Sequence, residues 1–550
     1  MAVDATEEHK PAGRFSKLWV ILFIFSTIAA SFSLFDLWKM KHLNFAAVAF
    51  GLAAGVHGQS SSQCSSSAQP NLSWYAPNQT MINNLTTVVN GTGVYGYIFN
   101  SSRTPSSVPY STYNWCNMPH ARKQEYVVPD NDFKLQYVEV VRLPTQFSQS
   151  RTVISFFRNQ LTYLQIHRHH KRTPYQSNTF PIEAYPWLCN DSSLYYFGAP
   201  QPENNAAQLA WSIYQSPTNP FKPTGFPNQT CQFPQITGEG LYDSRQHGAD
   251  LFSVYHDTLH FLPDTFNSSQ ISFRVTNNVI TSQVAGEVLI GMYSSLNQKP
   301  VPALVQPTGV DSLEPQYTCS AAVASYSAYG VGSKNPTWQT HLNQSTALFA
   351  QLDTISGVNS SDSGWHNWFD HYFDNLSAKL CHNKPLPCNI TNSSLCVSQD
   401  TANAVFRRGL YEYSYIYRDN NASLAAATGS FGVWMAELAS HLRGAMNGAG
   451  SGPIYRHNIA HDGSMSRLLS ILQIDVMVWP GMGSEIVFEL WRRQSSECYF
   501  LRVLWKGQVL RSSNPSLGSM DMVPVDVFLG YVDGLVGVDA SKVVALCSGK

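Results

Sequence analysis

The segment RHHKRTP at residues 168–174 constrains this chain more than any other, because it places His169 between Arg168 and Arg172. A planar guanidinium binds two oxygens of a phosphate group at once. A neutral imidazole between two such groups can attack phosphorus in line, since the arginines spread the developing negative charge. The residue types and their spacing therefore indicate phosphate chemistry on a short loop closed by a proline.

Two other interpretations of this segment compete with phosphate chemistry. A basic run is often only a solvated face of a protein. His167, His169 and His170 could also bind a metal ion, although ligands on one short loop usually need partners from elsewhere in the chain. The rest of the sequence has to decide among the three.

The composition indicates a large glycoprotein of the secretory pathway. The 550 residues carry a net charge of −1, and we expect no nucleic-acid partner because such a surface needs excess basic residues. Ten cysteines, all after residue 58 and none in a CxxC pair, indicate up to five disulfides. Cys381, Cys388 and Cys396 are close enough for a local bridge. Sequons for N-glycosylation occur at Asn71, Asn78, Asn84, Asn90, Asn100, Asn190, Asn228, Asn267, Asn343, Asn359, Asn375, Asn389, Asn392 and Asn421.

Two features of the N-terminal region, residues 1–58, compete as targeting signals. Residues 40–58 begin with a methionine and continue with a lysine, an apolar run and small residues, which is the pattern of a signal peptide. Residues 18–35 form an apolar run long enough to span a bilayer. We expect a secreted or extracellular protein that starts at Met40, with residues 1–39 as an upstream artefact. The alternative is a membrane anchor at residues 18–35.

The remaining sequence divides into an extension and one large domain. Residues 59–125 are rich in Ser, Asn, Thr and Gly and indicate a glycosylated, loop-rich extension. Within residues 126–550, strands are predicted at Lys134–Val140 and Pro453–Ala460. Helical periodicity is clear at Asp243–Phe261, Val279–Met292, Ala402–Tyr417, Leu424–Met446 and Ser464–Leu472. Strands at both ends around a helical middle predict an α/β core with a helical cap at roughly residues 262–400.

His461-Asp462 is the second candidate catalytic element. The pair follows a predicted strand, and Ser464 then opens a helix as a plausible N-cap. Ligands of α/β proteins lie at such strand ends, facing helix N-termini. Asp462 could protonate a leaving alkoxide and His461 could donate a hydrogen bond to a phosphate oxygen. The similar pair His256-Asp257 lies in a helical pattern and is expected to be structural.

These motifs together resemble the histidine acid phosphatases, branch 2 of the histidine phosphatase superfamily, and most closely their fungal secreted members. RHHKRTP is similar to the family signature R-H-G-x-R-x-P, with His170 where the family usually has Gly. Further similarities occur, in family order, at QITGEGLYDSRQHGADL (235–251), RVTNNVITSQVAGEVLIGM (274–292) and WPGMGSEIVFEL (479–490). The resemblance covers roughly residues 133–550.

The resemblance implies an α/β fold with a central mixed, mostly parallel sheet flanked by helices, and an inserted helical cap. It also implies a phosphohistidine intermediate, with neither metal nor cofactor. His169 would be the nucleophile and Asp462 the proton donor. The phosphate would be bound by Arg168, Arg172, His461 and Arg274. Ile280 stands where the family has another phosphate-binding arginine, and the loss of one such contact costs about 1.5–3 kcal/mol.

Residues 141–165 interrupt the family pattern. Their removal joins two pieces into LQYVEVIHRHHKRTP, an unbroken strand and loop. We therefore hypothesise that they are an unspliced intron translated in frame. If they belong to the protein, Tyr163–His167 either replaces the first strand and holds the loop, or the loop is displaced. A displacement of about 1 Å costs on the order of 100-fold in rate.

The sequence thus predicts a secreted, metal-independent acid phosphomonoesterase acting on a small phosphorylated substrate. An acidic optimum is expected because Asp462 must be protonated to act as the acid. Ile280 and the interruption favour an alternative, a catalytically inactive protein that binds phosphate or phosphoglycans. A structural cell-surface glycoprotein is a further alternative, favoured by the apolar N-terminus and the sequons. The sequence sets neither the physiological substrate nor the oligomeric state.

Overall fold

The computed structural model describes residues 69–94, 116–137, 163–182, 187–192, 196–197, 209–210, 213, 216–220, 230–296, 300–447 and 452–549. By its internal contacts the chain divides into Met1–Ser60 and Ser61–Lys550, and all described residues belong to the second unit. The expected signal peptide and the alternative anchor lie outside the described residues. Among the helices that are described, none combines the length and apolar character needed to cross a membrane.

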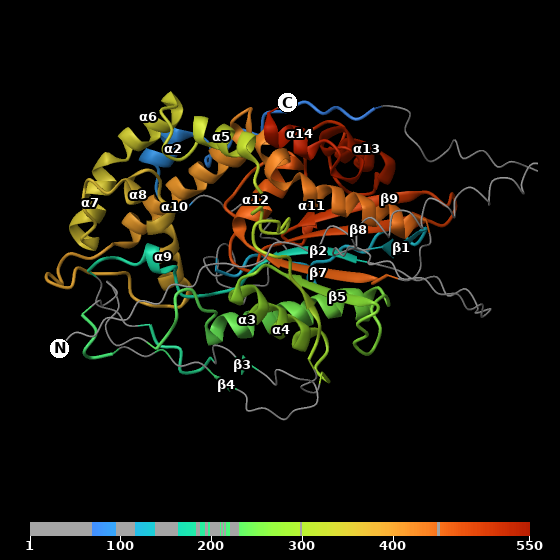
Figure 1. Ribbon diagram of the computed structural model, residues 1–550, viewed down its shortest axis with the longest axis horizontal. Helices are drawn as coiled ribbons and strands as arrows, with labels where there is room; N and C mark the ends of the chain where they lie inside the picture. Colours follow the sequence, from blue (N-terminus) through green and yellow to red (C-terminus); the bar gives the residue numbers. More distant parts are fainter. Residues whose placement is uncertain are drawn as a thin grey trace, which may run out of the picture. The chain divides into compact units, whose positions relative to one another are not determined.

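A mixed sheet lies at the centre of this unit, in the order β10-β9-β8-β2-β7-β5-β6, with β1 beside β8 and β11 beside β9 (Figure 1). Strands β2, β7, β5 and β6 run parallel, whereas β8 is antiparallel to β2 and to β9. The strands are β1 (Phe133–Tyr137), β2 (Tyr163–Arg168), β5 (Ile271–Val275), β6 (Ala303–Leu304), β7 (Tyr455–Ala460), β8 (Glu485–Arg493), β9 (Tyr499–Trp505), β10 (Gln508–Val509) and β11 (Val523–Pro524). Strands β3 (Tyr196–Phe197) and β4 (Leu209–Ala210) form a separate ribbon.

Helices cover both faces of the sheet, which confirms the expected α/β class (Figure 1). Helices α3 (Gly238–Phe252) and α4 (Val279–Met292) lie on one face; α11 (Ser423–Met446), α12 (Asp462–Ile471) and α13 (Val525–Val536) lie on the other. Every residue of β7 is buried, as expected for a parallel strand covered on both faces. Helices α3 and α4 approach closely because a Cβ atom on Gly248 would lie 2.1 Å from the Val288 carbonyl oxygen.

Further helices lie beyond the end of the sheet (Figure 1). They are α5 (Ser320–Tyr329), α6 (Pro336–Gln344), α7 (Thr346–Ser356), α8 (Ser363–His366), α9 (Asp370–Cys381) and α10 (Gln399–Ser414). The expected cap range of about 262–400 begins too early, because β5 within it pairs with β7 inside the sheet. Short helices α2 (Leu85–Asn90) and α14 (Val543–Ser548) complete the α-helices of the described residues.

The expected N-terminal extension is in part packed on the domain. Arg418 donates a hydrogen bond to the carbonyl of Tyr75 (2.6 Å), and Arg407 donates one to the carbonyl of Val88 (3.0 Å). Both arginines are buried, so these bonds fix residues 69–94 against α10 and the turn that follows it.

Disulfides join segments far apart in the sequence. The described bridges are Cys116–Cys381, Cys189–Cys231, Cys319–Cys547 and Cys388–Cys396. The last is the local bridge that the cysteine spacing predicts, whereas Cys381 pairs elsewhere. Of the described sequon asparagines, Asn375 and Asn389 are buried and the others are exposed.

Strands β1 and β2 lie along the same edge of β8. Tyr137 is opposite Leu490, and Leu164 is opposite Phe488. The two partners are thus two residues apart on β8, while Tyr137 and Leu164 are 27 residues apart in their own segment. The difference is 25 residues, the length of the segment 141–165. The two strands therefore have the register of one strand interrupted by that segment, and β2 leads into residues 168–174, which is one of the two expected arrangements.

Deletion of residues 141–165 should leave the fold intact. It joins Val140 to Ile166 without changing the register of the strand against β7 and β8, and it removes a loop whose closure costs entropy. We expect a melting temperature at least equal to that of the full chain, measured by calorimetry.

The matched control deletes one residue fewer, 141–164. This shifts the pairing by one residue and turns every side chain before Ile166 to the opposite face. We expect a clear loss of melting temperature or of soluble protein. Equal stability of the two deletion variants would contradict the single-strand interpretation.

Candidate active site

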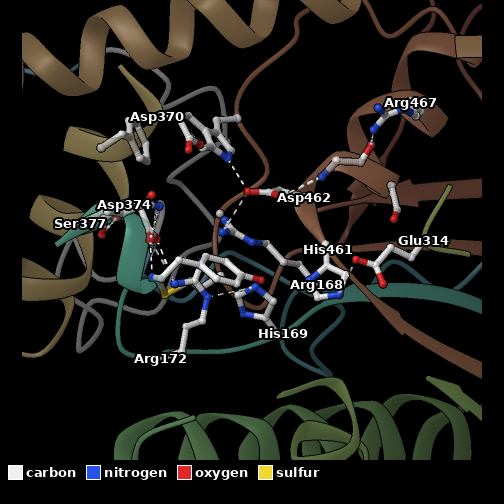
Figure 2. Close-up of a pocket in the computed structure, with 18 of the residues that line it drawn as sticks. Arg168, His169, Arg172, Glu314, Asp370, Asp374, Ser377, His461, Asp462 and Arg467 are labelled. Carbon is white, nitrogen blue, oxygen red and sulfur yellow. Dashed lines mark hydrogen bonds and ion pairs between the residues drawn. The ribbon is translucent and has the colours of Figure 1, made fainter. Parts of the chain in front are cut away.

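A cavity of about 380 Å³ opens beside the C-terminal ends of β2 and β7 (Figure 2). Carboxyl ends of adjacent parallel strands meet at one edge of a sheet, where α/β proteins hold ligands. Arg168 pairs with Ala460, so the loops that follow the two strands begin side by side. The lining residues are Arg168, His169, Arg172, Tyr175, Asn178, Glu314, Pro315, Gln316, Asp370, Phe373, Asp374, Ser377, His461, Asp462, Gly463, Ser464, Arg467, Trp479, Gly481 and Met482.

His169 presents a free nitrogen to this cavity. Its Nδ1 lies 3.0 Å from the carbonyl oxygen of His170, and a carbonyl only accepts, so Nδ1 carries the proton. Nε2 therefore holds the lone pair and lies 3.4 Å from Nε of Arg172. Burial, followed by the charges of Arg172 and Arg168, lowers the pKa of His169 well below its usual 6.5. A neutral imidazole with Nε2 exposed to the cavity is suited to nucleophilic attack.

Arg168 and Arg172 are both buried and both held by carboxylates (Figure 2). Arg168 Nη2 lies 3.1 Å from Oδ2 of Asp462, and Nη1 donates to the carbonyl of Pro480. Arg172 Nη1 lies 3.0 Å from Oδ1 of Asp374. These ion pairs hold two guanidinium groups beside His169 before any ligand binds.

Asp374 is itself fixed by neutral donors. Its Oδ2 accepts hydrogen bonds from Nδ2 of Asn178 (2.8 Å) and from the backbone N–H of Tyr175 (3.0 Å). The Arg172 guanidinium also lies over the ring of Tyr175, 4.4 Å from its centroid. The position of Arg172 thus depends on contacts from two sides.

Asp462 is the first residue of α12 and faces the loop of His169 across the cavity (Figure 2). Its Oδ2 also accepts a hydrogen bond from Nε1 of Trp479, at 2.7 Å. Burial favours the neutral carboxyl group, but the Arg168 charge and the Trp479 hydrogen bond outweigh burial and hold the pKa of Asp462 below 3.8. In the empty cavity Asp462 is therefore an anion.

His461 lies beside His169, with 5.6 Å between the ring centroids. Its Nε2 is 3.0 Å from Oγ1 of Thr276 and 3.7 Å from Oε1 of Glu314. Burial lowers the pKa of His461 to about 4. The structure therefore brings five of the predicted site residues into one cavity: Arg168, His169, Arg172, His461 and Asp462.

Arg274 lies elsewhere, which corrects the expectation that it binds the substrate phosphate. It is 3% exposed, and its guanidinium pairs with Asp311 (2.8 Å) and Glu437 (3.0 Å) outside the lining residues. Its charge is thus already satisfied by buried carboxylates. Ile280, at the place of the missing arginine, is fully buried in α4. His256, expected to be structural, bonds to Asp257 and Asp264 away from the cavity.

The sequence analysis did not find several lining residues. Asp370 and Asp374 both come from α9, where their spacing of four residues places them on one helix face. That spacing was the available signal. Arg467, one turn further along α12 than Asp462, also lines the cavity, and its Nη1 donates to the carbonyl of Gly463 (2.8 Å). Its position could not be inferred without the helix.

Comparison with known proteins agrees with this geometry. The model of the family described as histidine phosphatase superfamily (branch 2) matches residues 160–506, more than half of the chain. The chain belongs to this superfamily. Histidine phosphatases of branch 2 hydrolyse phosphate monoesters, and the chain is accordingly an enzyme of that class.

Individual relatives of this histidine phosphatase are distant. Human lysophosphatidic acid phosphatase type 6 is 24% identical over 322 residues, which are 57% of this chain and 69% of that protein. Klebsiella sp ASR1 phytase is 14% identical, with a TM-score of 0.45 over 70% of this chain and 98% of that one. The phytase from D. castellii is 12% identical, with a TM-score of 0.44 over 86% and 94% of the two chains.

Substitution of Asp370 should change the pH dependence of the histidine phosphatase's stability. Burial, then the charges of Asp374 and Asp462, raises the pKa of Asp370 well above 3.8. The folded state thus binds this proton more tightly than the unfolded state, so stability falls as pH rises from the unfolded pKa to the folded one. Asp370→Asn removes this loss, and we expect a higher melting temperature near neutral pH but no gain below about pH 3.5.

The control for this measurement is Asp400→Asn, at an exposed position in the first turn of α10. It should show no gain that grows with pH. A melting temperature of Asp370→Asn below that of the parent at neutral pH would show that the ionised carboxylate stabilises the fold.

Proposed function

We propose that His169 is the nucleophile of this phosphomonoesterase, that Arg168, Arg172 and His461 bind the transferred phosphoryl group, and that Asp462 is the proton donor. One observation carries the proposal. The free Nε2 of His169 faces a cavity flanked by two fixed guanidinium groups, with the carboxylate of Asp462 across it. Such groups stabilise the charge that develops on a phosphoryl group in transfer.

Substrate binding would exchange the partners of the two arginines. A phosphate dianion placed beside His169 competes with Asp462 for Arg168 and with Asp374 for Arg172. The Arg168 charge is the main cause that lowers the pKa of Asp462. Once the phosphate takes over that charge, the pKa of Asp462 rises and the carboxylate gains a proton. Binding of the anion thus prepares the acid.

The reaction then has two steps. Nε2 of His169 forms a bond to phosphorus while the bond from phosphorus to the ester oxygen breaks, and Asp462 gives its proton to the leaving alcohol. In the second step Asp462, now ionised, takes a proton from water, which attacks phosphorus and frees His169. Turnover is expected to decline as pH rises, because Asp462 must be protonated in the complex.

The charges of the cavity favour substrates with one phosphate group over polyphosphates. Its described lining includes four carboxylates, Glu314, Asp370, Asp374 and Asp462, against three arginines and no lysine. Stacked aromatic rings lie at one side, with 4.0 Å between the centroids of Phe373 and Trp479. We infer an uncharged alcohol with some apolar surface as the leaving group.

An oxidising compartment is part of the proposal. Four disulfides are described, and cysteine bridges persist in secreted proteins rather than in reducing compartments. Ten described sequon asparagines are exposed. We therefore infer a secreted glycoprotein.

The roles of the two central residues can be separated by leaving group. His169→Ala should lose at least about 10³-fold in kcat on every phosphate monoester and trap no phosphoenzyme. Asp462→Asn should lose about 10²–10⁴-fold on alkyl phosphates and much less on 4-nitrophenyl phosphate, whose leaving group needs no proton. Steady-state kinetics and rapid-quench labelling of the phosphohistidine measure both.

His256→Ala, outside the cavity, is the control and should retain full activity. A wild-type chain that binds phosphate without turnover would instead support the inactive binding protein. Equal losses of Asp462→Asn on both leaving groups would remove Asp462 from the role of acid.

The substrate class is tested by charge. We expect kcat/KM for phenyl phosphate to exceed that for inositol hexakisphosphate at the same pH, because the carboxylates repel the additional phosphates. Asp370→Asn and Glu314→Gln should narrow the difference. A preference of the wild-type enzyme for the hexakisphosphate would refute the inference.

A further inference from the structure

A cluster of buried histidines lies behind the catalytic loop. One nitrogen atom from each of His167, His170 and His247 lies within 4.8 Å of the others. The three rings come from β2, the loop after it and α3, and all three residues are 0% exposed. None of them lines the cavity described above. Their chemistry is therefore separate from the attack on phosphorus.

The proton on His247 can be located from its neighbours. Its Nε2 lies 2.9 Å from Oε2 of Glu485, whose other oxygen accepts the backbone N–H of Ala121. A carboxylate accepts, so Nε2 of His247 carries the proton. Nδ1 of the neutral ring then holds the lone pair.

The proton on His170 is fixed in the same way. Its Nδ1 lies 2.9 Å from Oγ of Ser244, and that hydroxyl group donates its own hydrogen to the carbonyl of Gly240 at 2.7 Å. The serine oxygen must therefore accept from Nδ1 of His170. Nε2 of this ring is left with the lone pair.

Two lone pairs consequently face each other. Nε2 of His170 and Nδ1 of His247 are 3.3 Å apart, with no proton to place between them. Two nitrogen ligands of one tetrahedral zinc ion, at about 2.05 Å each, are separated by about 3.3–3.4 Å. A proton shared by the two rings would create an imidazolium, which full burial disfavours. A bound metal cation resolves the contact without that cost.

Two more unpaired atoms point to the same ligand. Among the described residues, Nε2 of His167 and Oδ1 of Asn117 are buried without a hydrogen-bond partner. A Cβ atom on Gly483 would lie 3.0 Å from both Oδ1 of Asn117 and Nε2 of His170, so these two atoms border one small space. Three imidazole nitrogens and one amide oxygen make up a plausible four-coordinate set.

We propose that His167, His170 and His247 bind one structural zinc ion, with Asn117 as the fourth ligand. Each ring has a partner for its other nitrogen: His457 for His167 (3.3 Å), Ser244 for His170 and Glu485 for His247. Such outer partners orient histidine ligands at metal sites. Imidazole ligands suit zinc, copper, iron and nickel, and zinc accepts tetrahedral nitrogen and oxygen ligands.

The ion would act on catalysis only through position. The carbonyl of His170 accepts the N–H of His169, so an ion that fixes His170 also fixes the orientation of the nucleophile. The expectation of metal-independent chemistry is unaffected, because the ion lies outside the cavity. His170, which stands at a position where the resembling family has Gly, then supplies a ligand.

The experiment uses the full chain without a polyhistidine tag, purified from an oxidising host. Elemental analysis should find about one zinc per wild-type chain, and His247→Gln should lose most of it. His256→Gln, at an exposed histidine, is the matched control and should keep the zinc. Wild-type chain with less than about 0.1 equivalents, both as purified and after refolding with zinc chloride, overturns the proposal.

A second measurement applies if His247→Gln does not fold. Wild-type chain refolded with cobalt(II) chloride alone should show the visible absorption of a four-coordinate cobalt ion, which zinc then displaces. The metal-loaded chain should also melt at a higher temperature than the metal-free chain. Absence of both the absorption and the difference in melting temperature would show that the two rings share a proton instead.

Discussion

The pairing of β2 with both of its neighbours determines the rest of the structure. β2 runs parallel to β7 and antiparallel to β8, and its last residue, Arg168, is opposite Ala460. His169 and His461 therefore follow adjacent strand ends and meet at one edge of the sheet. The register also shows why an interruption of 25 residues is tolerated, since β1 and β2 keep the alignment of a single strand on β8. The loop is positioned by the sheet and not by the chain that precedes it.

The cavity is organised by ion pairs that exist before a substrate arrives. Arg168 is held by Asp462, and Arg172 is held by Asp374. A buried guanidinium without a partner would be costly, so the carboxylates keep the charges in place at low reorganisation cost. The same contacts make Asp462 an anion in the empty state and link its protonation to the arrival of phosphate. Binding and proton supply thus depend on one pair of side chains.

The catalytic loop and the His-Asp pair could be predicted from the sequence because each motif lies within a few residues and follows a recognisable strand. The α/β class followed from the order of strands and helices. Asp374 and Asp370 could not be predicted, since their place depends on how α9 packs against a loop some 200 residues earlier. Arg274 was misplaced for a related reason: its partners, Asp311 and Glu437, are distant in sequence and take up its charge. Local motifs reveal reacting groups, whereas tertiary packing decides their partners.

The bridge between Cys116 and Cys381 has a consequence for producing this enzyme. Cys381 ends α9, the helix that presents Asp374 to Arg172, and Cys116 directly precedes Asn117 behind the loop. One covalent link therefore ties both supports of the reactive segment to each other. A chain made in a bacterial cytosol would lack it, since thiols stay reduced there. Recombinant material from such a host would carry an arginine clamp without its tether, and its low turnover would reflect the host and not the sequence.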